Sequence, residues 1–64
     1  MQTPSQVSTV MANVPIGGVF WYQIAYYVKV DAGDAFDLAT SAVQGGFNGT
    51  EAVAYYPEAK LALL

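Results

Sequence analysis

The chain has 64 residues, of which 55% are hydrophobic and 11% are charged, and its net charge is −3. It contains no Cys, which excludes disulfides and thiolate zinc sites, and no His, the commonest general base and metal ligand. Its two basic residues, both lysines, stand against five acidic ones, whereas nucleic-acid binding needs several cationic side chains to neutralise phosphates. We therefore predict no enzymatic activity, no cofactor or metal site, and no nucleic-acid partner.

A chain of this length makes a single small domain spanning residues 1–64. Such a domain buries only about 60% of its unfolded surface and usually needs a disulfide, a metal or an oligomeric partner for support. No side chain in residues 1–28 is charged, so the basic segment of a secretory signal peptide is not expected there. The low charge also means that little electrostatic repulsion keeps copies of the chain apart. These features favour assembly with other chains and do not assign a cellular compartment.

The first predicted element is a helix that ends near Asn13. Thr3 can cap its N-terminus, Pro4 suits the first helical position, and Gln6 can complete a capping box. Pro15 disfavours helical geometry in the residue before it and so limits the helix. An apolar stripe at helical spacing supports the prediction, formed by Val7, Val10, Met11 and Val14.

Residues 19–30 follow a Gly17-Gly18 turn and are rich in aromatic and β-branched side chains, which favour a strand. With period two, the even-numbered positions form the more apolar face and are expected to be the better buried. So long a strand should bend or bulge near Gln23 or Ala25. The alternative is a membrane-spanning or buried helix, because residues 10–28 carry no charge, although Asn13 and Pro15 would interrupt a span.

A second helix is predicted over residues 34–44, with Asp34 as its N-cap and Gly45 as its C-cap. A loop over residues 45–50, a short strand over 51–56 and a final helical turn over 58–64 complete the chain. The expected fold is therefore α+β, a helix–strand–helix–strand unit stabilised by assembly. The alternative is a mostly helical fold with one membrane or buried hydrophobic helix.

Two groups of residues are candidate sites. Asp31, Asp34 and Asp37 lack the spacing of a calcium loop and fit a solvated helix N-terminus instead. The aromatic row could stack on a ligand, but Tyr and Trp are also enriched in protein interfaces, and no basic groove accompanies them. The predicted interface is formed by Phe20, Trp21, Tyr22, Ile24, Tyr26, Tyr27, Val28, Leu61, Leu63 and Leu64.

The predicted function is that of a non-enzymatic structural subunit, which self-associates or docks onto a larger assembly such as a virion, a filament or a multisubunit complex. One alternative is a single-span accessory subunit of a membrane complex, which makes a membrane partner possible but less favoured. The other is a small-molecule binding module built on the aromatic residues.

Overall fold

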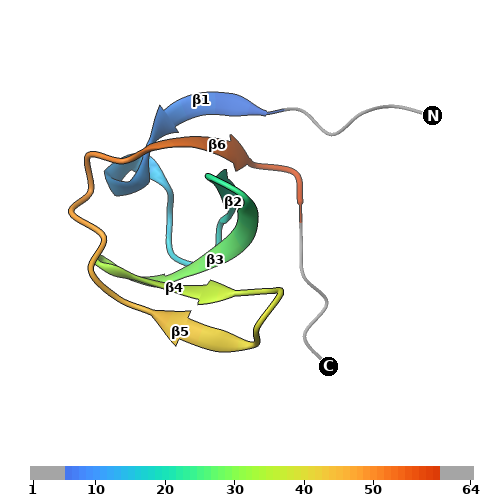
Figure 1. Cartoon of the computed structure of the whole chain (residues 1–64). Coiled ribbons are helices and arrows are strands. Elements are labelled where there is room, and N and C mark those ends of the chain that lie inside the picture. The colour runs from blue at the N-terminus through green and yellow to red at the C-terminus, as the bar shows by residue number, and fades with distance from the viewer. Residues whose placement is uncertain (1–5, 60–64) are drawn as a thin grey trace.

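The computed structural model describes residues 6–59, which form one curled antiparallel sheet (Figure 1). Neighbouring strands follow the order β1-β6-β2-β3-β4-β5, so β1 and β5 are the outer strands. The strands are β1 (Val7–Val10), β2 (Val19–Tyr22), β3 (Ala25–Asp31), β4 (Asp34–Asp37), β5 (Ala42–Gln44) and β6 (Ala52–Tyr56).

The expected α+β fold and its mostly helical alternative are both wrong. Within residues 6–59 the only helical element is a three-residue 3-10 turn, η1 (Met11–Asn13). The first predicted helix is replaced by β1 and η1, because β1 pairs with β6 along its whole length, from Val7 opposite Tyr55 to Val10 opposite Ala52. Long-range strand pairing thus overrides a local capping pattern, and the proposed caps at Thr3 and Pro4 lie outside the described residues.

The second predicted helix is also wrong, because residues 34–44 form the β4–β5 hairpin. Asp37, expected in the first turn of that helix, instead organises the hairpin turn. Its Oδ1 accepts hydrogen bonds from the backbone N–H groups of Ala39 at 2.8 Å and Thr40 at 3.3 Å, and its carbonyl accepts one from Ser41 at 2.8 Å. Asp is favoured in the first turn of a helix, where the dipole stabilises its charge, and also in hairpin turns, where it accepts backbone N–H groups, so the residue type alone does not separate the two.

The predicted single strand over residues 19–30 is two strands joined by a turn at Gln23 and Ile24. The bend expected near Gln23 is a full reversal, in which Gln23 has a φ of +58°. Phe20 pairs with Tyr27, so the inner face is even-numbered in β2 and odd-numbered in β3. The expected burial of the even positions therefore fails in the turn, where Ile24 is 90% exposed, and at the start of β3, where Tyr26 is 45% exposed.

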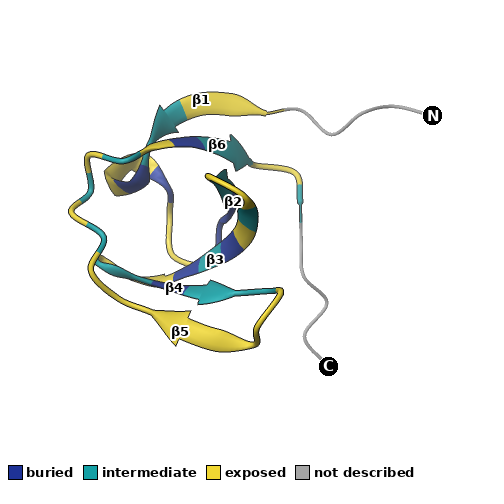
Figure 2. Ribbon diagram, in the orientation of Figure 1, coloured by how far each residue is buried: buried dark blue, intermediate teal, exposed yellow. Residues whose placement is uncertain are grey.

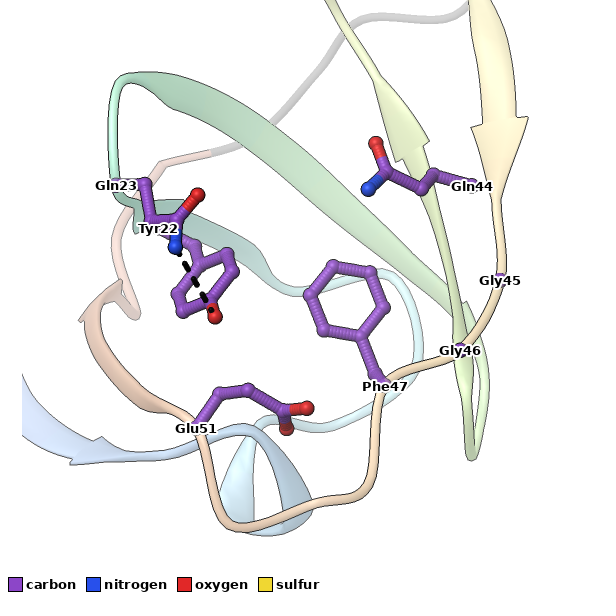
Figure 3. Close-up of a pocket in the computed structure, with 7 residues that line it drawn as sticks. All are labelled: Tyr22, Gln23, Gln44, Gly45, Gly46, Phe47 and Glu51. Atoms are coloured by element: carbon purple, nitrogen blue, oxygen red, sulfur yellow. Dashed lines mark hydrogen bonds between the residues drawn. The ribbon is translucent and has the colours of Figure 1, made fainter.

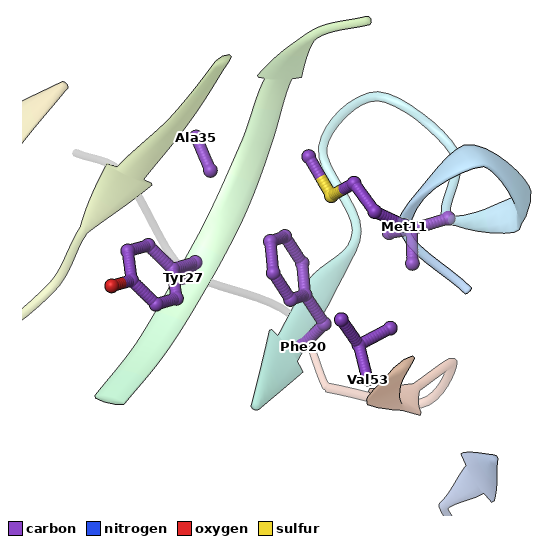
Figure 4. Packing of buried hydrophobic residues seen from close by; sticks show 6 residues of the cluster. Met11, Phe20, Tyr27, Ala35 and Val53 are labelled. Carbon is purple, nitrogen blue, oxygen red and sulfur yellow. The ribbon is translucent and has the colours of Figure 1, made fainter. Parts of the chain in front are cut away.

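The core lies on the inner face of the curled sheet, where the buried parts of β2, β3 and β6 face η1 (Figure 2). Phe20 is fully buried and stacks on Tyr27 with 5.5 Å between ring centroids, while Phe47 meets it edge-on at 6.0 Å. Figure 4 shows Phe20 and Tyr27 with other members of the buried cluster. The buried cluster consists of Met11, Val14, Phe20, Tyr27, Ala35 and Val53.

Lys29 lies on the inner face and is only 6% exposed. Its Nζ donates a hydrogen bond to the Met11 carbonyl at 3.0 Å, and that carbonyl also accepts the Val14 N–H at 3.1 Å. The Lys29 backbone N–H bonds the Gly18 carbonyl at 3.0 Å. This residue therefore connects β3 to the segment that closes one end of the core.

The predictions for residues 45–56 agree with the structure. The strand predicted over residues 51–56 is confirmed as β6, and residues 45–50 are a loop as expected. The final helical turn predicted over 58–64 falls mostly outside the described residues. In the described part of the chain, no helix has the length and apolar character needed to cross a membrane.

Gln23→Gly should stabilise the protein, because Gln23 adopts a left-handed φ of +58° that glycine tolerates without steric cost. We expect a gain of about 1 kcal/mol, or roughly 4–8 °C in Tm for a domain of this size. The matched change Gln44→Gly, in the extended strand β5, should instead cost about 0.5–1 kcal/mol. Thermal unfolding followed by circular dichroism measures both, and a loss of stability in Gln23→Gly would contradict the turn geometry.

Lys29→Met should leave the free energy of unfolding unchanged or raise it. The methionine keeps much of the apolar stem and removes a buried charge, while the Met11 carbonyl retains the Val14 N–H. Lys29→Ala should lower the free energy of unfolding by about 2 kcal/mol or more, because it leaves a cavity. Urea unfolding compares the variants, and equal destabilisation by Met and Ala would show that the charge itself is required.

Candidate functional site

The outer face of the sheet carries an apolar ladder that crosses five strands. Residues paired across antiparallel strands share a face, so the registers define this row directly. A second, shorter row beside it joins Ala54, Trp21 and Tyr26. We call the two rows together the outer apolar face; the five-strand row consists of Tyr56, Val19, Val28, Phe36 and Val43.

The outer apolar face contains no charged side chain, and its exposure increases from the centre of the sheet towards the outer strand β5. Val19 in β2 is 6% exposed, whereas Val43 in β5 is 61% exposed. Near the opposite end, Trp21 meets Tyr26 edge-on with 4.6 Å between ring centroids, and Tyr26 lies 5.8 Å from Tyr56. The face is therefore packed within itself but remains open to a partner along β3, β4 and β5.

The Tyr56 hydroxyl anchors one end of this face. It donates a hydrogen bond to Gln6 Oε1 at 2.9 Å, which connects residues at the two ends of the described chain. The neighbouring Tyr26 hydroxyl raises the pKa of Tyr56 above its ordinary value, and burial adds to the effect. A phenol is protonated at neutral pH, as the hydrogen bond from Tyr56 to Gln6 Oε1 requires.

The structure places the residues predicted to form an interface in different parts of the molecule. Trp21, Tyr26 and Val28 lie together on the outer apolar face. Phe20 and Tyr27 are core residues, which makes them unable to contact a partner in the folded chain. Tyr22 lines a pocket, Ile24 lies in the β2–β3 turn, and the three leucines Leu61, Leu63 and Leu64 fall outside the described residues.

Five members of the outer apolar face lie outside the predicted interface: Val19, Phe36, Val43, Ala54 and Tyr56. The helix predicted over residues 34–44 contains both Phe36 and Val43, and a helix does not pair these residues as the β4–β5 hairpin does. The Thr40-Ser41 pair before Val43 is the signal that could have indicated a turn between two short strands.

A shallow pocket of about 210 Å³ opens beside the β2–β3 turn, where the loop after β5 passes the start of β6 (Figure 3). Tyr22 and Phe47 provide aromatic walls, with 5.6 Å between their ring centroids. The Gln23 amide donates a weak hydrogen bond to the Tyr22 hydroxyl at 3.4 Å. The full lining is Tyr22, Gln23, Gln44, Gly45, Gly46, Phe47 and Glu51.

Glu51 is the only charged residue in the pocket lining. Its Oε2 accepts the Asn48 N–H at 2.7 Å and its Oε1 accepts the Gly49 N–H at 2.9 Å. These backbone hydrogen bonds, led by that of Asn48, hold the pKa of Glu51 below its ordinary value. The pocket therefore presents a fixed carboxylate that stays ionised at neutral pH.

The acidic residues Asp31, Asp34 and Asp37 do not form a helix N-terminus, because Asp31 ends β3 while Asp34 and Asp37 are the first and last residues of β4. The Asp31 carboxylate accepts the Ala32 N–H at 2.8 Å and Asp37 organises the next turn. Across residues 6–59, no group of three metal-ligating side chains is close enough to hold an ion.

Comparison with known proteins yields no relative. No family model matches the chain, and neither does any curated protein or solved structure. The functional argument therefore rests on the geometry of the outer apolar face and the pocket.

Tyr26→Phe should lower the pKa of Tyr56 towards the ordinary tyrosine value of about 10, because it removes the hydroxyl that most raises it. The control Tyr55→Phe, in the same strand but on the opposite face, should leave the Tyr56 titration unchanged. Ring-carbon NMR signals followed against pH report the titration directly. An unchanged Tyr56 titration in Tyr26→Phe would contradict the contact.

The same contact predicts how stability depends on alkaline pH. A phenol whose pKa is raised in the folded state loses its proton more readily when the chain unfolds. The contact between Tyr26 and Tyr56 therefore contributes its full stabilisation below about pH 10, and this contribution declines as the pH rises through the folded-state pKa of Tyr56. Urea unfolding between pH 8 and pH 11 should show a smaller decline in Tyr26→Phe than in the wild type. An equal decline in the two proteins would oppose this assignment.

Proposed function

We propose that this protein is a non-enzymatic structural subunit that self-associates through its outer apolar face. The observation that supports the proposal is the uncharged ladder across five strands, on the side of the sheet away from the core. A sheet with one face solvated normally alternates apolar and polar residues, and here both faces of β2 and β3 are apolar over much of their length. Such a second apolar face is typical of a surface covered by another protein.

A second copy of the chain is the partner that best fits this surface. The ladder offers no charge for a charged partner to recognise, and an uncharged apolar face is complementary to itself. Aromatic residues dominate one end of the face, as in protein interfaces generally. Self-association would also bury Val43 and Tyr26, which are otherwise exposed in a chain with few solubilising charges.

The outer apolar face could also dock the protein onto a larger assembly built from repeated subunits. This is the broader form of the proposed structural role. Neither form requires nucleic acid, and the two lysines against five acids oppose such a partner. The chain lacks His and Cys, and three of its five acidic residues, Asp31, Asp37 and Glu51, accept backbone hydrogen bonds in turns, which supports a non-enzymatic role.

Val43→Lys should weaken self-association, because it places a charge in the most exposed part of the outer apolar face. Ile24→Lys is the matched control, since Ile24 is an even more exposed aliphatic side chain but lies in the β2–β3 turn. We expect the dissociation constant to rise at least about tenfold for Val43→Lys and to stay unchanged for Ile24→Lys.

Sedimentation velocity over a range of protein concentrations measures both variants against the wild type. Circular dichroism confirms that each variant is folded. A wild-type chain that remains monomeric at high micromolar concentration would reject the proposal, as would equal weakening by the two substitutions.

A further inference from the structure

The pocket beside the β2–β3 turn combines a fixed negative charge with aromatic walls. Figure 3 shows the Glu51 carboxylate on one side of the space and the rings of Tyr22 and Phe47 above it. The carboxylate is held by two backbone N–H groups rather than by a cationic side chain, and no Lys or Arg lines the pocket. Its charge therefore remains free to attract a ligand.

The two rings narrow the class of ligand. Aromatic faces attract cations through their quadrupole, and the attraction adds to that of a nearby carboxylate. An anionic ligand would meet Glu51 without any compensating positive charge, and it would also approach a chain with a net charge of −3. Both considerations favour a positively charged ligand.

The volume of the pocket and the amide of Gln44 further limit the class of ligand. A volume of about 210 Å³ accommodates an ammonium or guanidinium group together with part of an alkyl stem. The amide of Gln44 lies across the pocket, where its Oε1 already accepts the Tyr27 hydroxyl at 3.4 Å. That weak bond leaves the Gln44 amide able to contact a ligand as well.

We propose that this pocket binds an organic cation on an alkyl stem, such as a primary amine or the side chain of Lys or Arg in a partner. Glu51 would pair with the cationic group, while Tyr22 and Phe47 would contact the cation and its stem. This site lies outside the outer apolar face, so it is independent of the proposed self-association.

The test is an NMR titration of the full chain with N-acetyl-lysine amide, N-acetyl-arginine amide and butylamine. N-acetyl-norleucine amide and N-acetyl-citrulline amide are the uncharged counterparts. We expect the cationic probes to shift the signals of Gln44, Gly46 and Glu51 at millimolar concentrations, and the uncharged ones to bind at least about tenfold more weakly. Tighter binding of the amino-acid amides than of butylamine would support recognition of a partner's side chain, and equal binding would support a free amine.

Two variants test the assigned contacts. Glu51→Gln should weaken binding about tenfold or more, whereas Glu58→Gln, which removes the same charge outside the lining, should not. Because Glu51 also holds its own loop, Tyr22→Leu provides a second variant, which removes an aromatic wall and should weaken binding without changing the net charge. Salt should weaken wild-type binding. Equal binding of charged and uncharged probes, unchanged binding by Glu51→Gln, or no binding at 50 mM probe would overturn the proposal.

Discussion

The turn at Gln23 and Ile24 is the constraint on which the rest of the structure depends. It reverses the chain after only four residues of β2 and pairs Phe20 with Tyr27. This register directs the two largest core rings to the inner face and Val19 and Val28 to the outer one. A shift by one residue would exchange the two faces, because successive side chains point to opposite sides of a strand. β4 and β6 then pair on either side of this hairpin and inherit its alternation.

Both faces of the sheet are apolar as a result, and they have different roles. The inner face is closed by η1 and Phe47, and its packing includes the buried Lys29 amine bound to the Met11 carbonyl. Such a small core provides limited stability by itself, so burial of a second apolar surface would help a chain of this size.

The sequence predicted the strand character of residues 19–30 and 51–56 and the loop between residues 45 and 50, because aromatic, β-branched and Gly-rich patterns are local signals. It did not predict the turn, since Gln23 and Ile24 are unusual at positions where Asn, Asp and Gly are preferred. Asp37 was predicted in the first turn of a helix but organises the turn between β4 and β5, and Asp is favoured at both positions, so the residue type alone does not distinguish them.

The predicted interface combines residues that the structure places on different faces. It includes the core residue Phe20 and the exposed Tyr26, because it rests on aromatic and apolar character over residues 20–28 and not on the turn between β2 and β3. The ladder partners Phe36 and Val43 could be recognised only after β4 and β5 were known to pair. Glu51 is one of five acidic residues in the sequence, and its fixed position in the pocket depends on two backbone contacts that no residue spacing reveals.

The central claim is that one face of the sheet forms the core and the other associates with a second copy. The most direct measurement is a series of methyl NMR spectra recorded on the wild-type chain as it is diluted. The valine methyl signals of the outer apolar face, from Val19, Val28 and Val43, should shift with concentration, while those of the core residues Val14 and Val53 should remain fixed. Concentration-dependent shifts at Val14 and Val53, or none at all, would contradict the account.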